Sequence, residues 1–117
     1  MKPTRSQITA AARRYVKLVE WSEEDRCYVG SAPPLIGRAC HGRTEAEVIA
    51  RLQVIVEEWV EHLLREGRPL PESTAKRKYS GKFLVRVPPE LHKQAVLKAM
   101  SRGDSLNQFV AEAIADA

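Results

Sequence analysis

The sequence predicts an α+β protein built from two unlike modules. Three observations predict it: short alternations of apolar and polar residues before residue 44, one long helical repeat of apolar residues after it, and a separate strand-and-helix pattern beyond residue 80. Alternation with a period of two is typical of strands, and apolar residues three and four apart are typical of one helix face. A chain of 117 residues has room for one domain of ordinary size or for two small ones.

Three strands are expected in the first module, residues 15–72. YVKLVEWS alternates apolar and polar residues, the acidic EEDR turns the chain, and CYVGS predicts the returning strand of a hairpin. PPLIG then interrupts the pattern, and RACHG predicts a short third strand that ends at Gly42. Residues 1–14 form an N-terminal extension. Its basic residues could contact nucleic acid, but a disordered basic tail is the plainer interpretation; they are Lys2, Arg5, Arg13 and Arg14.

One long helix should follow this sheet. Thr44 is a good N-cap, and Glu47 three residues later is typical of a capping box. Gly67 is the expected end of the helix, and residues 68–70 are a candidate for a short further strand. Spacings of three and four predict one buried apolar face, which consists of Val48, Leu52, Ile55, Trp59 and Leu63.

The charge is divided unevenly along the chain. Residues 1–72 hold 11 Lys/Arg and 11 Asp/Glu, whereas residues 73–117 hold 8 Lys/Arg and 4 Asp/Glu. Residues 73–80 are polar, carry a basic triplet and predict a linker. The asymmetry is typical of a nucleic-acid-binding part joined to a part with another role, although a net charge of +4 is also ordinary for a protein surface.

The second module, residues 81–117, begins with a predicted strand. Because side chains alternate between the faces of a strand, Phe83, Val85 and Val87 share one apolar face. The opposite face carries Lys82, Leu84 and Arg86.

Two helices are expected after this strand. Pro88 ends the strand, and Pro89 suits the first turn of a helix that runs to Arg102. Gly103 stops that helix, and Ser105 caps a second one.

A module of about 37 residues without disulfides or a metal is too small to fold alone, so it should pair with a second copy of itself. An antiparallel pair of the predicted strands would complete the hydrogen bonding and would display Lys82, Leu84 and Arg86 twice. A two-stranded ribbon of this kind fits the major groove of DNA. The alternative is a solvated strand face with no ligand.

The pattern GKFLVRVPPELHKQ…GDSLNQFV resembles the ribbon-helix-helix DNA-binding domain of Arc- and MetJ-like repressors over residues 81–116. The resemblance implies that the side chains of Lys82, Leu84 and Arg86 contact bases. Leu84 departs from the polar residue often found there, so it either contacts a thymine methyl group or contributes no recognition. The resemblance also implies that the backbone amides at the start of the second helix hold a DNA phosphate. These amides belong to Ser105, Leu106 and Asn107.

The first module is similar to a HicB-type antitoxin domain. The similarity is carried by the WSEED hairpin, the YV strand, the LIG turn, HGRT, and a helix that ends in GRPLP. The family's turn continues as Gly-Cys, whereas this chain has Gly37 followed by Arg38. This resemblance implies a truncated RNase H-like fold, and with both modules in this order it extends over residues 15–116.

The two resemblances together imply the antitoxin of a type II toxin-antitoxin system. Such a protein neutralises a small HicA-type toxin that cleaves mRNA, and it represses its own operon by binding operator DNA. A toxin that binds RNA should be basic, so the acidic turn of Glu23, Glu24 and Asp25 is a candidate contact surface. A solvated turn explains these residues equally well.

Catalysis is not expected. RNase H chemistry needs several carboxylates that converge on two metal ions, whereas the acidic residues here lie in one turn and along a helix. His41, His62 and His92 lie on separate elements, and Cys27 and Cys40 are expected as free thiols. No catalytic residue, cofactor or metal is therefore predicted.

A cytoplasmic protein is expected, because no apolar run approaches the length of a membrane span and the N-terminus lacks the apolar core of a secretory signal. The expected assembly is a homodimer through residues 81–117, or a higher oligomer. The alternative function is a free-standing ribbon-helix-helix repressor whose first module senses a ligand or only oligomerises.

Overall fold

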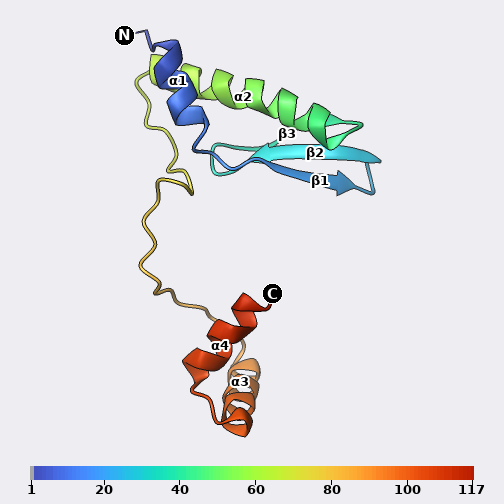
Figure 1. Cartoon of the computed structure of the whole chain (residues 1–117), viewed down its shortest axis with the longest axis vertical. Coiled ribbons are helices and arrows are strands. Elements are labelled where there is room, and N and C mark those ends of the chain that lie inside the picture. Colours follow the sequence, from blue (N-terminus) through green and yellow to red (C-terminus); the bar gives the residue numbers. More distant parts are fainter. Residues whose placement is uncertain (1) are drawn as a thin grey trace. The chain divides into compact units, whose positions relative to one another are not determined.

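The computed structural model describes residues 2–117, and these confirm an α+β chain with four helices and one three-stranded antiparallel sheet (Figure 1). The described residues divide into two compact units, with the boundary between Tyr79 and Ser80. The sheet and two helices lie in the first unit, and two helices lie in the second.

The sheet has the three strands that the sequence predicts. They are β1 (Leu18–Ser22), β2 (Cys27–Ala32) and β3 (Ile36–Gly42), hydrogen-bonded in the order β1-β2-β3. β3 begins two residues earlier than RACHG suggests, and the register between β2 and β3 shifts on either side of Ser31. Helix α2 covers one face of this sheet (Figure 1).

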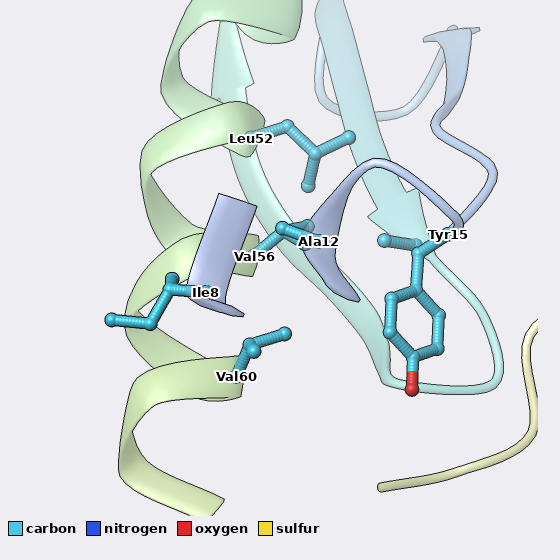
Figure 2. Close-up of a cluster of buried hydrophobic side chains, with 7 residues drawn as sticks. Ile8, Ala12, Tyr15, Leu52, Val56 and Val60 are labelled. Atoms are coloured by element: carbon cyan, nitrogen blue, oxygen red, sulfur yellow. The ribbon is translucent and has the colours of Figure 1, made fainter. Parts of the chain in front are cut away.

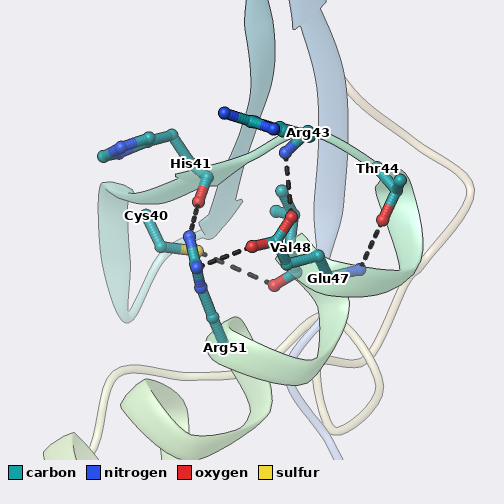
Figure 3. Close-up of polar contacts among 7 residues, drawn as sticks. All are labelled: Cys40, His41, Arg43, Thr44, Glu47, Val48 and Arg51. Carbon is teal, nitrogen blue, oxygen red and sulfur yellow. Dashed lines mark hydrogen bonds and ion pairs between the residues drawn. The ribbon is translucent and has the colours of Figure 1, made fainter.

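Helix α2 (Glu45–Arg65) begins at the predicted N-cap, because the Thr44 hydroxyl accepts the N–H of Glu47 at 3.1 Å. The predicted capping box is only half formed (Figure 3). The Glu47 carboxylate accepts the N–H of Arg43 at 3.0 Å, not that of Thr44, and it pairs with the Arg51 guanidinium at 2.6 Å. Arg51 also donates to the carbonyl of His41, so these contacts fasten the end of β3 to the first turns of the helix.

Helix α2 ends in a turn that two backbone hydrogen bonds close. Gly67, with φ of 67°, donates its N–H to the carbonyl of Leu64, and Arg68 donates to Leu63. This pattern is the Schellman motif, which a glycine forms without steric cost. The short strand considered for residues 68–70 is absent from the described structure, and Leu70 packs against the hydrophobic core instead.

The prediction for residues 1–14 was wrong in its main point, since they include helix α1 (Arg5–Ala12). Thr4 and Gln7 form a complete capping box at its start. Ile8 and Ala12 are buried against α2, and Arg5 pairs with Glu57 at 2.6 Å (Figure 2). The helix is therefore part of the core and not a tail.

The presence of α1 also changes which face of α2 is buried. Of the predicted face, Ile55 is only half-buried and Trp59 is 42% exposed. Val56 and Val60 take their place and are fully buried where α1 packs, as Figure 2 shows. The buried residues of α2 are Val48, Leu52, Val56, Val60 and Leu63.

The second unit contains α3 (Pro89–Arg102) and α4 (Leu106–Ala115), with the predicted start and end of α3 and the predicted cap of α4. Gly103, with φ of 73°, donates to the carbonyl of Met100, and Asp104 donates to Ala99 at 2.9 Å. Residues 81–87 form no strand within the single chain. The strand and the ribbon-helix-helix assignment therefore remain predictions, as does the RNase H-like assignment of the first unit.

None of the helices in the described residues is both long enough and apolar enough to cross a membrane.

Candidate nucleic-acid interface

The segment that carries Lys82, Leu84 and Arg86 is exposed along its whole length in the single chain. It starts at a local turn in which Gly81 has φ of 84° and the Ser80 hydroxyl accepts the N–H of Lys82 at 3.1 Å. Lys82 and Arg86 have no ion-pair partner within residues 2–117. Both cations are therefore available to an external ligand.

Apolar side chains alternate with these cations and are also exposed. Phe83 is 73% exposed and Val85 is 60% exposed, with Val87 less so. The two helices bury little in compensation, because Ala99 is the one fully buried residue of α3 and α4 has none. Further exposed apolar residues of this unit are Leu91, Leu97, Met100, Val110 and Ile114. An apolar surface of this extent on so small a unit is typical of a surface that a partner covers.

At the start of α4, some backbone N–H groups are hydrogen-bonded and others are not. The Ser105 hydroxyl accepts the N–H of Gln108 at 3.1 Å, and the Gln108 side chain accepts the N–H of Ser105 at 2.9 Å. In the described residues, the N–H groups of Leu106 and Asn107 have no acceptor. The structure thus places all three predicted residues at the helix start and leaves two amides, not three, for an anion.

Arg102 adds a cation to this end of the unit, and it was not among the residues predicted from the sequence. Its guanidinium lies 5.2 Å from the centre of the Phe109 ring, so it stacks against the first turn of α4. The basic residue in the last turn before Gly103 was the signal that could have identified it.

The acidic turn between β1 and β2 divides into two parts. Asp25 accepts hydrogen bonds from Arg38 at 2.8 Å and from the Ser22 hydroxyl at 3.0 Å. These two contacts, led by Arg38, hold the pKa of Asp25 below its usual value. Glu23 and Glu24 are exposed and make no ion pair in the described chain, so they carry the unpaired negative charge of this turn.

The open face of the sheet has a shallow depression of about 470 Å³ beside this turn. Arg38 and His41 of β3 border it together with Asp25 and Cys27. Neither cysteine is disulfide-bonded, and burial raises the pKa of the Cys40 thiol, which lies 3.7 Å from the carbonyl of Val48 (Figure 3). Residues 2–117 contain no group of three or more His, Cys, Asp or Glu side chains placed to hold a metal ion.

Fold and surface together define a two-unit α+β protein whose second unit has exposed cations and an uncovered apolar surface. The HicB family model matches residues 67–114, from the end of α2 through most of α4, and this match supports a HicB-type protein. The matched residues do not include most of the first module, in which the antitoxin-domain motifs lie. Comparisons with curated proteins and with solved structures found no match.

Proposed function

We propose that this chain is the antitoxin of a type II toxin-antitoxin system. Its first unit binds and neutralises a HicA-type toxin that cleaves mRNA, and its second unit binds operator DNA and represses the operon. The observation that carries this proposal is the HicB family match over residues 67–114. The exposed residues of the second unit supply a physical mechanism for the DNA-binding half.

In this mechanism, residues 81–87 of two chains pair as antiparallel strands. Pairing removes Phe83, Val85 and Val87 from water, each of which is substantially exposed in one chain. Full burial of a fully exposed side chain of this size contributes about 1.5–3 kcal/mol, so the six partly exposed side chains of a dimer offset a large part of the cost of association.

The paired strands then present Lys82, Leu84 and Arg86 of both chains to the major groove. Arginine can donate two hydrogen bonds to one guanine, which makes Arg86 the strongest candidate for base recognition. The unused amides of Leu106 and Asn107 bind a backbone phosphate at the positive end of α4. Base contacts and phosphate contacts therefore come from different elements: the phosphate contacts position the protein, and the base contacts give specificity.

The first unit acts by binding and has no catalytic role. Glu23 and Glu24 project from the β1–β2 turn without ion-pair partners in the described chain, and they attract the basic surface of an RNA-binding toxin. Asp25 is held by Arg38 and contributes more to the shape of the turn than to its free charge.

A matched pair of substitutions tests the arrangement of the ribbon. Val85→Ser and Leu84→Ser each replace one exposed aliphatic residue, but the two positions lie on opposite faces of the proposed strand. Sedimentation velocity of the full chain should show that Val85→Ser weakens the dimer, whereas Leu84→Ser leaves it intact. A monomer caused by Leu84→Ser, or equal effects of the two changes, would refute the proposed pairing.

A further inference from the structure

The basic triplet of the predicted linker is fixed to the first unit. Ser73 is 4% exposed, and its carbonyl accepts the N–H groups of Lys76 at 3.2 Å and Arg77 at 3.0 Å. Just before it, the carbonyl of Pro71 accepts the hydroxyl of Tyr15, a buried core residue. The Tyr79 hydroxyl donates to the carbonyl of Thr74 at 3.1 Å and closes the turn. Residues 71–79 therefore form an ordered turn next to the end of α1.

Helix α1 brings two more cations to the same place. Arg13 and Arg14 follow its last residue and are both exposed. Arg14 and Lys76 border one depression of about 250 Å³, which Ala11 and Tyr15 of the α1 region also line. Arg14 and Lys76 lie beside this depression, and Arg13, Arg77 and Lys78 adjoin them in the sequence. We call these five cations the α1–turn cluster.

The cluster differs from most of the other arginines of the first unit. Five of those seven are paired with carboxylates, as Arg5 is with Glu57 and Arg38 is with Asp25. No member of the cluster forms an ion pair within residues 2–117, although Glu72 borders the same depression. Such a group of unpaired, exposed cations favours a ligand with closely spaced negative charges.

The boundary between the two units lies after the basic triplet, so the positive charge is divided between the units differently than the sequence suggested. Residues 1–79 hold 14 Lys/Arg and 11 Asp/Glu, whereas residues 80–117 hold 5 and 4. Most of the positive excess therefore belongs to the first unit, where the α1–turn cluster lies. The second unit by itself is almost neutral, so further cations of the first unit would strengthen the attraction to a phosphate backbone.

We propose that the α1–turn cluster binds the phosphate backbone of duplex DNA beside the bases that the second unit contacts. This inference rests on the proposed DNA-binding function. Lys78 precedes Lys82 by four residues, and four residues of chain span at most about 14 Å. DNA held by Lys82 would therefore have phosphates within the chain's reach of Lys78, the end of the cluster, since duplex DNA carries one charge per about 1.7 Å of its axis.

The test is the salt dependence of DNA binding by the full chain. The probe is a duplex of arbitrary sequence about four helical turns long, because phosphate contacts need no operator sequence. The variant combines Arg14→Gln with Lys76→Gln, the two cations that border the same depression. Each lost phosphate contact should lower the slope of log K against log salt by about 0.9, or by about 1.8 for each bound chain.

The matched control combines Arg26→Gln with Arg43→Gln. It removes the same charge from the same unit, but from the β1–β2 turn and the β3–α2 connection, at the end of the sheet away from α1 (Figure 1). Melting temperatures of both variants establish that the first unit remains folded. A reduced slope for the cluster variant with an unchanged slope for the control would support the inference.

Other outcomes separate this inference from the proposed function. Equal slopes for both variants and the unaltered protein would overturn the cluster contact while DNA binding by the second unit stands. A cluster variant that loses affinity for single-stranded RNA but not for duplex DNA would also overturn it. If a Lys82→Ala and Arg86→Ala double variant binds like the unaltered protein while the cluster variant does not, the cluster is supported and base recognition by the second unit fails. No binding of any duplex by the unaltered chain would refute both.

Discussion

Gly30 lies in the centre of β2, directly below α2, and its lack of a side chain allows this close packing. A Cβ atom at Gly30 would lie 2.6 Å from Cγ1 of Val48, 3.2 Å from the sulfur of Cys40 and 3.3 Å from Cδ2 of Leu52. Val48 and Leu52 are fully buried, and a β-branched side chain in a helix has one strongly preferred rotamer. Val48 therefore cannot rotate away, and Gly30→Ala must displace α2 from the sheet.

The size of the effect follows from two opposing contributions. Overpacking a core costs about 1–3 kcal/mol, whereas replacing glycine by alanine stabilises by about 0.4–1 kcal/mol because the unfolded chain loses freedom. We expect Gly30→Ala to lower the free energy of unfolding by about 1–2 kcal/mol. Urea unfolding followed by tryptophan fluorescence measures this change in the first unit alone, because both tryptophans, Trp21 and Trp59, lie there.

Gly37→Ala is the matched control for this experiment. A Cβ atom at Gly37 of β3 would meet no atom within 4 Å, and its φ is not in the left-handed region. This control should be neutral or more stable by up to about 1 kcal/mol. A Gly30→Ala protein as stable as the Gly37→Ala protein would show that α2 does not pack on β2 as closely as described.

Three further predictions concern the core, the acid response and DNA recognition. Ile8→Ala should destabilise the first unit by about 2–5 kcal/mol in urea unfolding, because Ile8 is buried against α2; no change would contradict a packed α1. The N–H of Arg43, and then the charge of Arg51, lower the pKa of Glu47. The ionised carboxylate therefore stabilises the folded protein fully above the usual pKa of 4.5, and this stabilisation is lost as the pH falls through the lower pKa of the folded state. Glu47→Gln should therefore flatten the decline in stability below about pH 4.5, and an unchanged acid profile would refute this role. Arg86→Ala should weaken binding to the chain's own upstream DNA by about 1–3 kcal/mol in fluorescence anisotropy, and Lys93→Ala in α3 serves as the same-charge control; equal losses would count against base recognition by Arg86.

Helix ends were the part of the fold that the sequence predicted best. Pro89, Gly103 and Ser105 determine the limits of α3 and the start of α4 by local chemistry, and the structure agrees at each one. The same holds for Thr44 and Gly67 at the two ends of α2. Caps and stops depend on a few neighbouring backbone groups, so they need no knowledge of tertiary contacts.

Helix α1 was missed because its sequence offers little periodic signal. Ile8 is its one large apolar residue, and the other buried position is the small Ala12. The Thr4 to Gln7 spacing of a capping box was the available clue. Because the prediction lacked α1, nothing in the sequence favoured Val56 over Ile55 as the buried residue of α2.

The DNA-contact roles of the candidate site stay predictions, and only the position of its helix start is confirmed. The sequence placed Ser105, Leu106 and Asn107 at a helix start, but the use of the Ser105 amide by Gln108 depends on side-chain geometry. The boundary of the charged region was also displaced, because the burial of Ser73 joins the basic triplet to the first unit through tertiary contacts. Residues 81–87 need a second chain for pairing, so one chain does not test the strand.

The most direct test of the proposed antitoxin function is an RNA cleavage assay with the product of the adjacent small open reading frame. Cleavage is measured with the toxin candidate alone and with an equal concentration of this protein, and a variant with Glu23→Lys and Glu24→Lys serves for comparison. We expect cleavage to disappear when the unaltered protein is added and to return in part with the charge-reversed variant. Cleavage that persists at equal concentration, or a neighbour without nuclease activity, would contradict the antitoxin function and would favour a free-standing DNA-binding repressor.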